Sequence, residues 1–340
     1  MQGLSSINYP MPPLSAPQLS SLLPPLISPS MPPFLPLVAA ALAGTFLDRL
    51  LGEPRRWHPL VGFGRCADGI EQALRRGAPG HALFNRLRGL LGWLLLVIPA
   101  VLAAAWLGRQ AWGWLADVAL LYLALGARSL QQHGAQVASD LAVGDLAAAR
   151  THVGWLVSRD TSALDEEGVA RAAVESILEN GNDAVFGTLF WFLLAGGAGA
   201  VLYRLANTLD AMWGYRDQRR LYFGWAAARI DDLLNLVPAR LTALTYALLG
   251  DTRNAWSCWR RQAASWSSPN AGPVLAAGAG ALAVRLGGAA IYHGKLEQRP
   301  GVGAGDTAQG GHIHAALALV QRGLWLWLAC AGLLAALGHA

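Results

Sequence analysis

Acidic and basic side chains recur at helical spacing in the middle of the chain, just before a strongly apolar run. Glu167, Arg171, Glu175 and Glu179 stand four residues apart, so they would form one polar stripe on a helix. Asp183 carries this stripe up to the apolar run. One interpretation is a solvated helix face with ion pairs. We favour a functional site, because carboxylates beside a membrane-like segment are costly and usually mark function.

A second polar cluster follows the apolar run. Arg204, Asn207 and Asp210 are three residues apart and therefore lie on one side of a helix, and Tyr215 and Arg219 come shortly after them. The arginines alone would be explained as an anchor for lipid headgroups. That role does not explain an amide and a carboxylate among apolar residues, which indicate a site.

A third cluster stands at the mouth of the next apolar segment. Asp231 and Asn235 are four residues apart, Asp232 and Asn235 are three apart, and Arg229 and Arg240 flank them. One aspartate would serve as a helix cap. Two acids and an amide exceed what a cap requires.

The three clusters share one chemistry. Carboxylate oxygens suit Mg²⁺, which proteins commonly hold through one or two carboxylates together with phosphate oxygens. Arginine forks bind phosphate through paired hydrogen bonds. The residues therefore predict a membrane-bound enzyme that acts on phosphate-bearing substrates with Mg²⁺.

Several other classes of site lack their motifs in this sequence. The sole lysine, Lys295, is not part of a phosphate-binding loop, and neither HExxH nor GxSxG occurs. The three cysteines form no CxxC pair, which argues against a thiolate metal site. His58 is the most suggestive histidine, although a histidine before proline is more often a structural loop residue. No basic patch suited to nucleic acid is present.

The chain that must position these residues has the composition of a membrane protein. Of its 340 residues 54% are hydrophobic and only 14% are charged, whereas soluble domains carry about a quarter charged residues. The net charge of +5 is explained by arginine in cytoplasmic loops. The clearest predicted spans are Phe34–Leu51, Gly89–Leu107, Ala111–Gly126, Ala271–Ile291 and Gly323–Gly338.

One apolar stretch, Ala184–Tyr203, predicts a different element. Its continuous apolar part is only about 12 residues long, which is too short to span. The glycine cluster Gly196–Gly199 then separates two half-length helices. This pattern favours a re-entrant hairpin, which would return Asp183 and Asp210 to one aqueous face.

The predicted architecture is all-α: a polytopic membrane bundle forming a single domain over residues 34–340. Residues 127–183 are expected to form two or three amphipathic helices under the membrane domain, and no strand is expected. Residues 1–33, rich in proline and lacking Lys and Arg, are expected to be a disordered extension.

Five long runs in the sequence resemble the CbiB/CobD family, the membrane enzymes of cobalamin biosynthesis called adenosylcobinamide-phosphate (cobinamide) synthases. The resemblance covers roughly residues 35 to 335, with the runs in the family's order. The runs are LLGEPRRWHPLVGFGR, VSRDTSALDEEGVARAAVESILENGNDAVFGTLFW, YRLANTLDAMWGY, FGWAAARIDDLLNLVPARLTAL and SSPNAGPVLAAGAGALAVRLGG.

The resemblance implies an ATP-dependent ligase in the cytoplasmic (inner) membrane. Its reaction would join (adenosyl)cobyric acid to aminopropanol or aminopropanol phosphate through an amide. The expected partners are the corrinoid, the amino alcohol and the lipid bilayer, and association with other membrane enzymes of cobalamin assembly is compatible with this reading.

Roles for the site residues follow as hypotheses from the placement of the motifs. Mg²⁺ or nucleotide is assigned to Glu175, Glu179, Asp183 and Asp210, together with Asn207. Asp231 and Asp232 are assigned to catalysis, through a second metal or by orienting the amine. Substrate or phosphate binding is assigned to Arg171, Arg204, Tyr215, Arg219, Asn235, Asn270 and His58.

Two alternatives remain open at this point. A Mg²⁺-dependent prenyl or phospho-alcohol transferase also places Asp and Asn clusters at the mouths of membrane helices. A non-enzymatic transporter or membrane sensor would need a polar path with access from both sides, and the hairpin argues against such a path.

Overall fold

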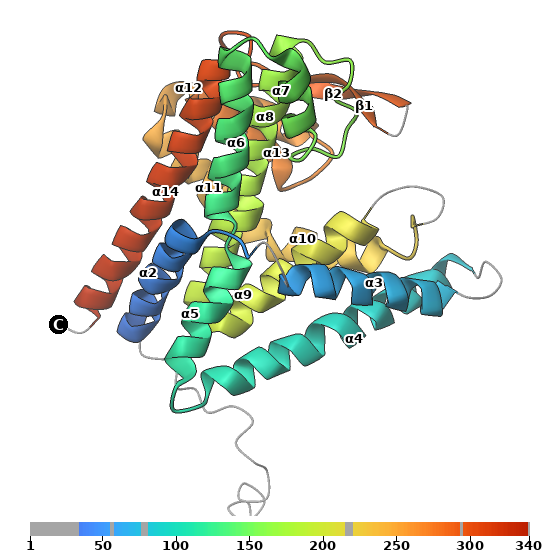
Figure 1. Ribbon diagram of the computed structural model, residues 1–340, viewed down its shortest axis with the longest axis vertical. Helices are drawn as coiled ribbons and strands as arrows, with labels where there is room; N and C mark the ends of the chain where they lie inside the picture. The colour runs from blue at the N-terminus through green and yellow to red at the C-terminus, as the bar shows by residue number, and fades with distance from the viewer. Residues whose placement is uncertain (1–33, 55–57, 76–80, 215–219, 293–294, 339–340) are drawn as a thin grey trace, which may run out of the picture. The chain divides into compact units, whose positions relative to one another are not determined.

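The computed structural model describes residues 34–54, 58–75, 81–214, 220–292 and 295–338, and within them the chain is mainly helical (Figure 1). The predicted extension 1–33, Tyr215 and Arg219 lie outside the described residues. The helices of the first half are α2 (Phe34–Leu51), α3 (Pro59–Arg75), α4 (Ala82–Gly108), α5 (Gly113–Ala124), α6 (Ala127–Ala142) and α7 (Leu146–Val153). They are followed by α8 (Glu166–Asn180), a π-helical turn η1 (Gly181–Phe186), α9 (Gly187–Trp213), α10 (Trp225–Leu234), α11 (Leu236–Leu249), α12 (Thr252–Gln262), α13 (Ala271–Ala281) and α14 (Gly310–Leu337).

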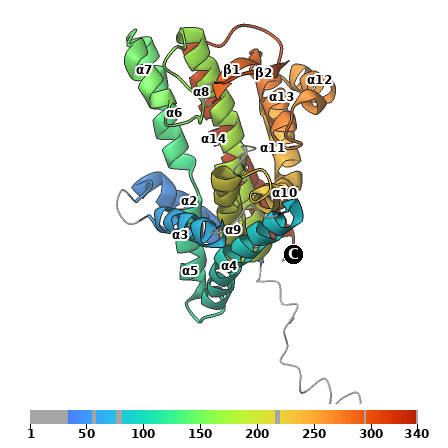
Figure 2. The same cartoon turned by 90° about the vertical axis from the view of Figure 1, so that its right-hand side faces the viewer.

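Helix α8 lies at the centre of the larger hydrophobic core. From Gly168 to Leu178 every residue except Arg171 is buried, because α6, α7, α13 and α14 pack around it (Figure 2). Small residues such as Ala172 and Ala173 let these neighbours approach closely. The prediction of two or three helices between residues 127 and 183 is confirmed by α6, α7 and α8, although α8 is buried on nearly every side rather than on one face.

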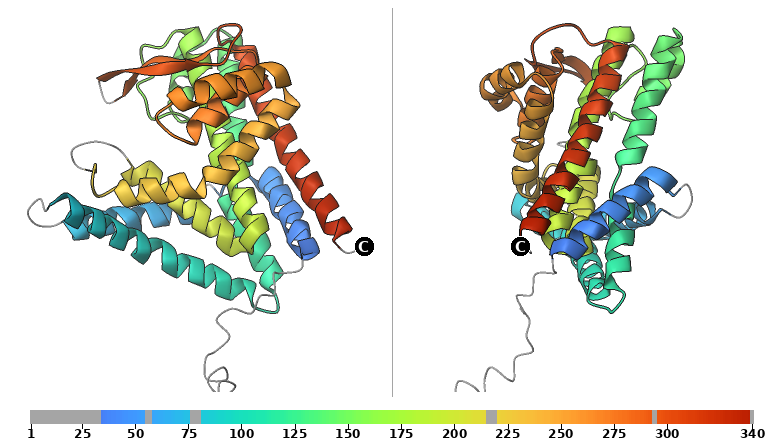
Figure 3. Two further views of the ribbon diagram at one scale, coloured as in Figure 1. Left: turned by 180° about the vertical axis from the view of Figure 1, so that it is seen from behind. Right: turned by 90° about the vertical axis from the view of Figure 1, so that its left-hand side faces the viewer.

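A second core joins α3, α4 and α10 to the latter part of α9 (Figure 3). Trp93 and Val97 of α4 meet Leu209 and Trp213 of α9 there, and the Trp213 ring stacks edge-on against Phe223 with centroids 5.0 Å apart. This core holds the end of α9, and with it the second predicted cluster, in a defined position.

Five helical stretches among the described residues are long and apolar enough to cross a membrane, which supports a multi-pass membrane protein. They contain four of the five predicted spans and the hairpin segment. The stretches are Phe34–Leu51, Ala82–Gly108, Gly113–Ala142, Glu166–Trp213 and Gly310–Leu337.

The predicted span Ala271–Ile291 is wrong. Its helical part, α13, has 11 residues, all of them buried. A helix of that length is about 16 Å long, roughly half the hydrocarbon thickness of a bilayer. The chain then forms strand β1 (Leu286–Tyr292), which pairs antiparallel with β2 (Lys295–Val302). The apolar run is thus a core helix followed by a β-hairpin, which the sequence did not predict.

The predicted helical hairpin is confirmed within α9. The backbone leaves helical geometry at Ala195 (φ −142°, ψ 23°) and at Gly196 (φ 63°, ψ −154°), and the chain reverses there. Asp117 of α5 accepts a hydrogen bond of 2.8 Å from the N–H of Gly197 and so caps the returning arm. The arms lie so close that a Cβ on Gly187 would overlap the Tyr203 hydroxyl.

Gly196→Ala should destabilise the fold by about 1–3 kcal/mol, because its backbone conformation is essentially confined to glycine. The measurement is thermal unfolding of the purified chain in detergent. Gly332→Ala in α14 is the matched control, since a Cβ there meets nothing within 4 Å and alanine favours the helix. Equal unfolding midpoints for the two variants would show that the turn does not depend on this conformation.

Candidate active site

A cavity of about 460 Å³ lies where the hairpin meets α8. Glu179 of α8, Asp183 of η1 and Asp210 of the returning arm of α9 all line it. The hairpin therefore brings the ends of two predicted clusters to one cavity, as expected. The catalytic and metal-binding roles of these residues stay predictions.

The π-helical turn η1 determines how Asn182 and Asp183 are presented. Such turns insert an extra residue per turn and are frequent at functional sites. The Asn182 side-chain N–H₂ donates to Asp183 Oδ1 and to Asn235 Oδ1, both at 2.8 Å, while its oxygen accepts from the Thr242 hydroxyl at 2.9 Å. Asn182 is thus a buried and fully bonded link that holds the Asp183 carboxylate in place.

Asn235 joins this link to α10 and to the hairpin. Its Oδ1 accepts a second hydrogen bond from the Tyr203 hydroxyl at 2.7 Å, and its N–H₂ donates to Asp231 Oδ2 at 3.2 Å. Asn207 donates to the other oxygen of Asp231 at 3.4 Å. The three predicted clusters therefore form one polar network in which Asn235 is the common member.

The Asp231 carboxyl is buried in this network, in α10, outside the five candidate spans. Burial raises its pKa well above the usual range, and the negative charges of Asp183 and Asp210 raise that pKa further. Hydrogen bonds from Asn235 and Asn207 oppose part of this increase. Asp231 therefore retains its proton to a higher pH than an exposed aspartate.

We expect the stability of the wild type to fall relative to Asp231→Asn as the pH rises above about 4, the usual pKa of an aspartate. The folded state binds the Asp231 proton more tightly than the unfolded state, so its contribution is complete at low pH and is lost as the pH passes the raised pKa. The measurement is the unfolding midpoint of both proteins as a function of pH. A hydrogen bond lost in Asp231→Asn would shift its whole curve by a constant amount without changing how steeply the midpoint depends on pH.

Asp160→Asn is the control of opposite sign. The N–H of Ser162 lowers the pKa of Asp160, so its stabilising effect is present at neutral pH and is lost as the pH falls. Identical slopes for Asp231→Asn and the wild type would contradict the assignment of a raised pKa to Asp231.

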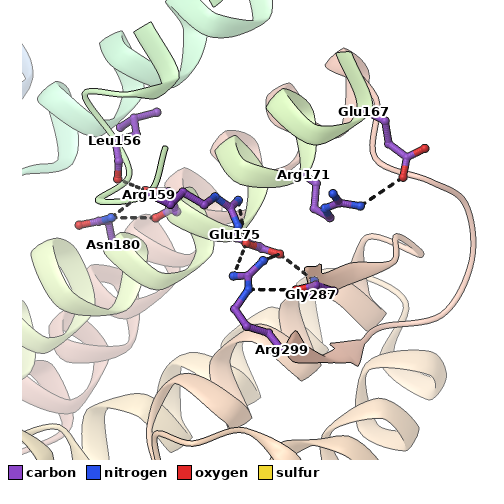
Figure 4. A network of polar contacts seen from close by, with 10 residues as sticks. Leu156, Arg159, Glu167, Arg171, Glu175, Asn180, Gly287 and Arg299 are labelled. Carbon is purple, nitrogen blue, oxygen red and sulfur yellow. Dashed lines mark hydrogen bonds and ion pairs between the residues drawn. The ribbon is translucent and has the colours of Figure 1, made fainter. Parts of the chain in front are cut away.

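Glu175 has a different environment from the one predicted for a metal ligand (Figure 4). Its Oε2 pairs with Arg159 at 3.0 Å and Arg299 at 2.8 Å, and its Oε1 accepts from the N–H of Gly287 at 2.7 Å and from Arg299 at 3.2 Å. Four donors occupy the lone-pair sites of one carboxylate. This geometry does not support Glu175 as a Mg²⁺ ligand, and it makes Glu175 the residue that anchors the β-hairpin to α8.

The other members of the stripe on α8 separate into two environments. Arg171 pairs with Glu167 at 3.4 Å on the exposed side of the helix, which matches the interpretation as a solvated ion pair. Glu179 is exposed at the cavity. Only the latter is positioned to meet a ligand in the 460 Å³ cavity.

Asp232 and Asn270 lie at the junction of α10, α11 and α13, beside the network. The Asp232 carboxylate pairs with Arg229 at 3.2 Å, and its backbone carbonyl accepts from Asn270 at 2.8 Å. Asn270 in turn accepts from Arg240 at 2.5 Å. These contacts support a structural role at the start of α13, and the predicted catalytic and binding roles stay untested.

A larger cavity, of about 1130 Å³, lies beside α3 and α6, and His58 and Arg204 line it together with Glu53. His58 Nδ1 accepts the N–H of Leu60 at 3.2 Å, so the neutral ring carries its proton on Nε2 and acts there as a donor. Arg204 interacts electrostatically with Asp183, which lines the 460 Å³ cavity. One residue lining each cavity therefore lies within electrostatic range of a residue lining the other.

The fit of Mg²⁺ to this donor set is limited. Within the part of the chain that the structure describes, no three His, Cys, Asp or Glu side chains are grouped closely enough to hold a metal ion. Mg²⁺ that arrives on a phosphate needs only one or two protein carboxylates. Asp183 and Asp210 satisfy that lesser requirement, so the site fits a metal bound together with its substrate.

Several residues of the network were not predicted. Tyr203 precedes Asn207 by four residues and shares its helix face, so its spacing was a usable signal. No comparable spacing relative to the predicted site residues pointed to Thr242 or Arg159. Arg299 lies 124 residues from Glu175, and no local signal connects the two.

The sequence profile of the family described as CobD/Cbib protein matches residues 41–320. The cobalamin biosynthesis protein CobD of Chromobacterium violaceum is 61% identical over 286 residues, which cover 83% of this chain and 92% of that protein. The protein of the same name from Stutzerimonas stutzeri is 61% identical over 290 residues, covering 85% and 95%. That from Mycobacterium tuberculosis is 41% identical over 288 residues, covering 82% and 89%. No solved structure matches this chain significantly.

Proposed function

Because the chain belongs to the CobD/CbiB family, we propose that it is a membrane enzyme of cobalamin biosynthesis that joins a corrinoid acid to an amino alcohol. The specific reaction is ATP-dependent amide formation between (adenosyl)cobyric acid and aminopropanol or aminopropanol phosphate. The proposed location is the cytoplasmic membrane.

The observation that carries this proposal is a pair of cavities, one lined by Arg204 and the other by Asp183, two residues that interact electrostatically. The larger one, about 1130 Å³, exceeds the range of roughly 300–1,000 Å³ typical of small-molecule pockets, as a corrinoid requires. The smaller one carries the carboxylates of Asp183 and Asp210. A bulky acid in the larger cavity and a phosphate-bearing reactant in the smaller one would react between Arg204 and Asp183.

Amide formation requires the carboxylate to be activated, because a carboxylate is a poor electrophile. In the proposed sequence the carboxylate oxygen accepts the terminal phosphoryl group of ATP and ADP leaves. The amine nitrogen then attacks the acyl carbon and loses a proton as inorganic phosphate leaves. Mg²⁺, when bound with the phosphates, would neutralise part of their charge.

The chain's own residues would act in four ways. Asp183 and Asp210 would hold the Mg²⁺ that accompanies the phosphates, and Arg204 would stabilise negative charge on the reactants. Glu179, exposed at the cavity, would accept the proton of the amine. His58 would donate from Nε2 to an acceptor on the corrinoid. Asn182 and Asn235 would act as positioning residues, since they bond to Asp183 and Asp231 within the network.

The test is incubation of the purified chain, in detergent and in lipid vesicles, with cobyric acid, MgATP and each amine in turn. Cobinamide phosphate should form from aminopropanol phosphate, or cobinamide from aminopropanol, and ADP should appear in equal amount. Omitting ATP should abolish the product. A folded chain that forms neither product would overturn the proposal, and product without ATP turnover would overturn its energetic part.

A further inference from the structure

A third cavity, small and separate from the two above, lies between α2, α6 and α14. Its volume is about 50 Å³, and it shares no lining residue with the 460 Å³ or the 1130 Å³ cavity. Thr45 and Asp48 of α2, Gln131 of α6 and Gln321 of α14 line it. Nothing in the proposed reaction uses these residues.

Two polar atoms in this cavity lack a partner. Thr45 Oγ1 and Asp48 Oδ1 belong to side chains that are each 2% exposed, and neither atom has a hydrogen-bond partner among the described residues. The second carboxylate oxygen of Asp48 accepts the N–H of Arg128 at 2.9 Å. A buried polar atom left unbonded costs about 1–3 kcal/mol, and more when it is charged. Both atoms are therefore available to accept hydrogen bonds from a bound donor.

The mouth of the same cavity has the opposite charge. Arg49 and Arg128 line it with exposed side chains, and Trp325 stands beside them. Guanidinium groups bind phosphate. Arg49 lies in the last turn of α2, a candidate span, which places the mouth near the headgroup level.

We infer that this cavity binds the primary ammonium of an O-phosphorylated amino alcohol, with the phosphate held at the mouth. An ammonium has three N–H donors, and Asp48 Oδ1, Thr45 Oγ1 and the amide oxygen of Gln131 or Gln321 are acceptors for them. A water-sized group needs about 10–15 Å³ of such space, so the cavity of about 50 Å³ admits an ammonium. Arg49 and Arg128 then meet the phosphate.

Two molecules carry this chemistry. One is the headgroup of phosphatidylethanolamine in the bilayer. The other is a soluble amino alcohol phosphate, and only this second source rests on the proposed function. A trimethylated ammonium, as in phosphocholine, has no N–H to donate and is larger, so it should be rejected.

The first arm of the test is calorimetric titration of the full-length chain in detergent free of phosphatidylethanolamine. Phosphoethanolamine should bind at least about tenfold more tightly than phosphocholine, since one charge-assisted hydrogen bond is worth that factor. Asp48→Asn should lose about tenfold in affinity for phosphoethanolamine. Asp68→Asn on the exposed face of α3 is the control and should bind as the wild type does.

The second arm distinguishes the sources. Wild-type chain and Asp48→Asn are placed in nanodiscs that contain phosphatidylethanolamine or only phosphatidylcholine, and retained lipid is counted by native mass spectrometry. If the wild type retains phosphatidylethanolamine and Asp48→Asn does not, the ligand is the lipid headgroup. If phosphoethanolamine binds in the first arm but the lipid is not retained, the ligand is the free phosphate ester.

The inference is overturned by equal affinity for phosphoethanolamine and phosphocholine, because that result leaves only arginine–phosphate contact or water in the cavity. It is equally overturned if Asp48→Asn binds like the wild type. Should Asp48→Asn fail to fold, Thr45→Val provides the same comparison, because it removes the other unpartnered acceptor of this cavity and should also weaken phosphoethanolamine binding. Failure here leaves the amide-forming assay unaffected, because the two tests use different readouts.

Discussion

Asp183→Asn should lower the rate of cobinamide formation by about 10²-fold or more, while the chain stays folded. The substitution keeps the size of the side chain and an oxygen that can accept from Asn182, but it removes the negative charge that faces the 460 Å³ cavity. The Asp183 charge would hold the Mg²⁺ beside the reacting phosphate, and loss of one preorganised electrostatic interaction in an active site typically costs this much. The measurement is product formation under saturating and limiting ATP, which separates kcat from KM.

Asp68→Asn is the matched control for this experiment. It removes the same charge from the exposed face of α3, outside the residues that line the cavities, and should leave the rate unchanged. Asp210→Asn should resemble Asp183→Asn, because both carboxylates line the same cavity. If Asp183→Asn has the wild-type rate and an unaltered unfolding midpoint, the hairpin is not part of the active site.

Glu175→Ala should destabilise the chain by about 3–5 kcal/mol, which is a large fraction of the stability of a typical domain. The Arg159 side chain is only 4% exposed, so without Glu175 its charge would be buried without its partner. The N–H of Gly287 would lose its acceptor as well. Thermal unfolding in detergent gives the change, and limited proteolysis should report release of the β-hairpin before global unfolding.

Glu167→Ala provides the comparison on the same helix. Glu167 pairs with Arg171 in a position where its side chain is 46% exposed, and surface pairs of this kind contribute about 0–1 kcal/mol. A similar loss of stability in both variants would mean that the buried Glu175 network contributes no more than a solvated pair, contrary to its geometry.

The structure brings Glu179, Asp183 and Asp210 to one cavity, and this proximity could be predicted because helical spacing is a local property. Glu179, Asp183, Asn207 and Asp210 could be placed on helix faces from their intervals alone, and the glycines at the turn predicted that the chain would reverse. The network that holds these residues depends on Asn235 and Tyr203, which come from different elements. Spacing along one helix contains no information on such pairs.

The environments that the sequence did not predict are those of residues whose partners are distant in sequence. Glu175 and Glu179 have the same local pattern and line the same cavity, yet the Glu175 carboxylate is buried and paired with Arg159 and Arg299, whereas Glu179 is exposed. The apolar run after Asn270 also has the composition of a span, but its helix ends at Ala281 within the core. In both cases the outcome depends on what packs against the segment.

The sequence by itself determined the membrane class, the helices and their hairpin, because hydropathy, periodicity and the backbone freedom of glycine act within a few turns. Tertiary structure alone decided which carboxylates are paired, which face a cavity, and which, like Asp48, are buried with an oxygen lacking a partner among the described residues. The physical reason is that the charge state and the bonding of a side chain are set by burial and by donors brought from far along the chain.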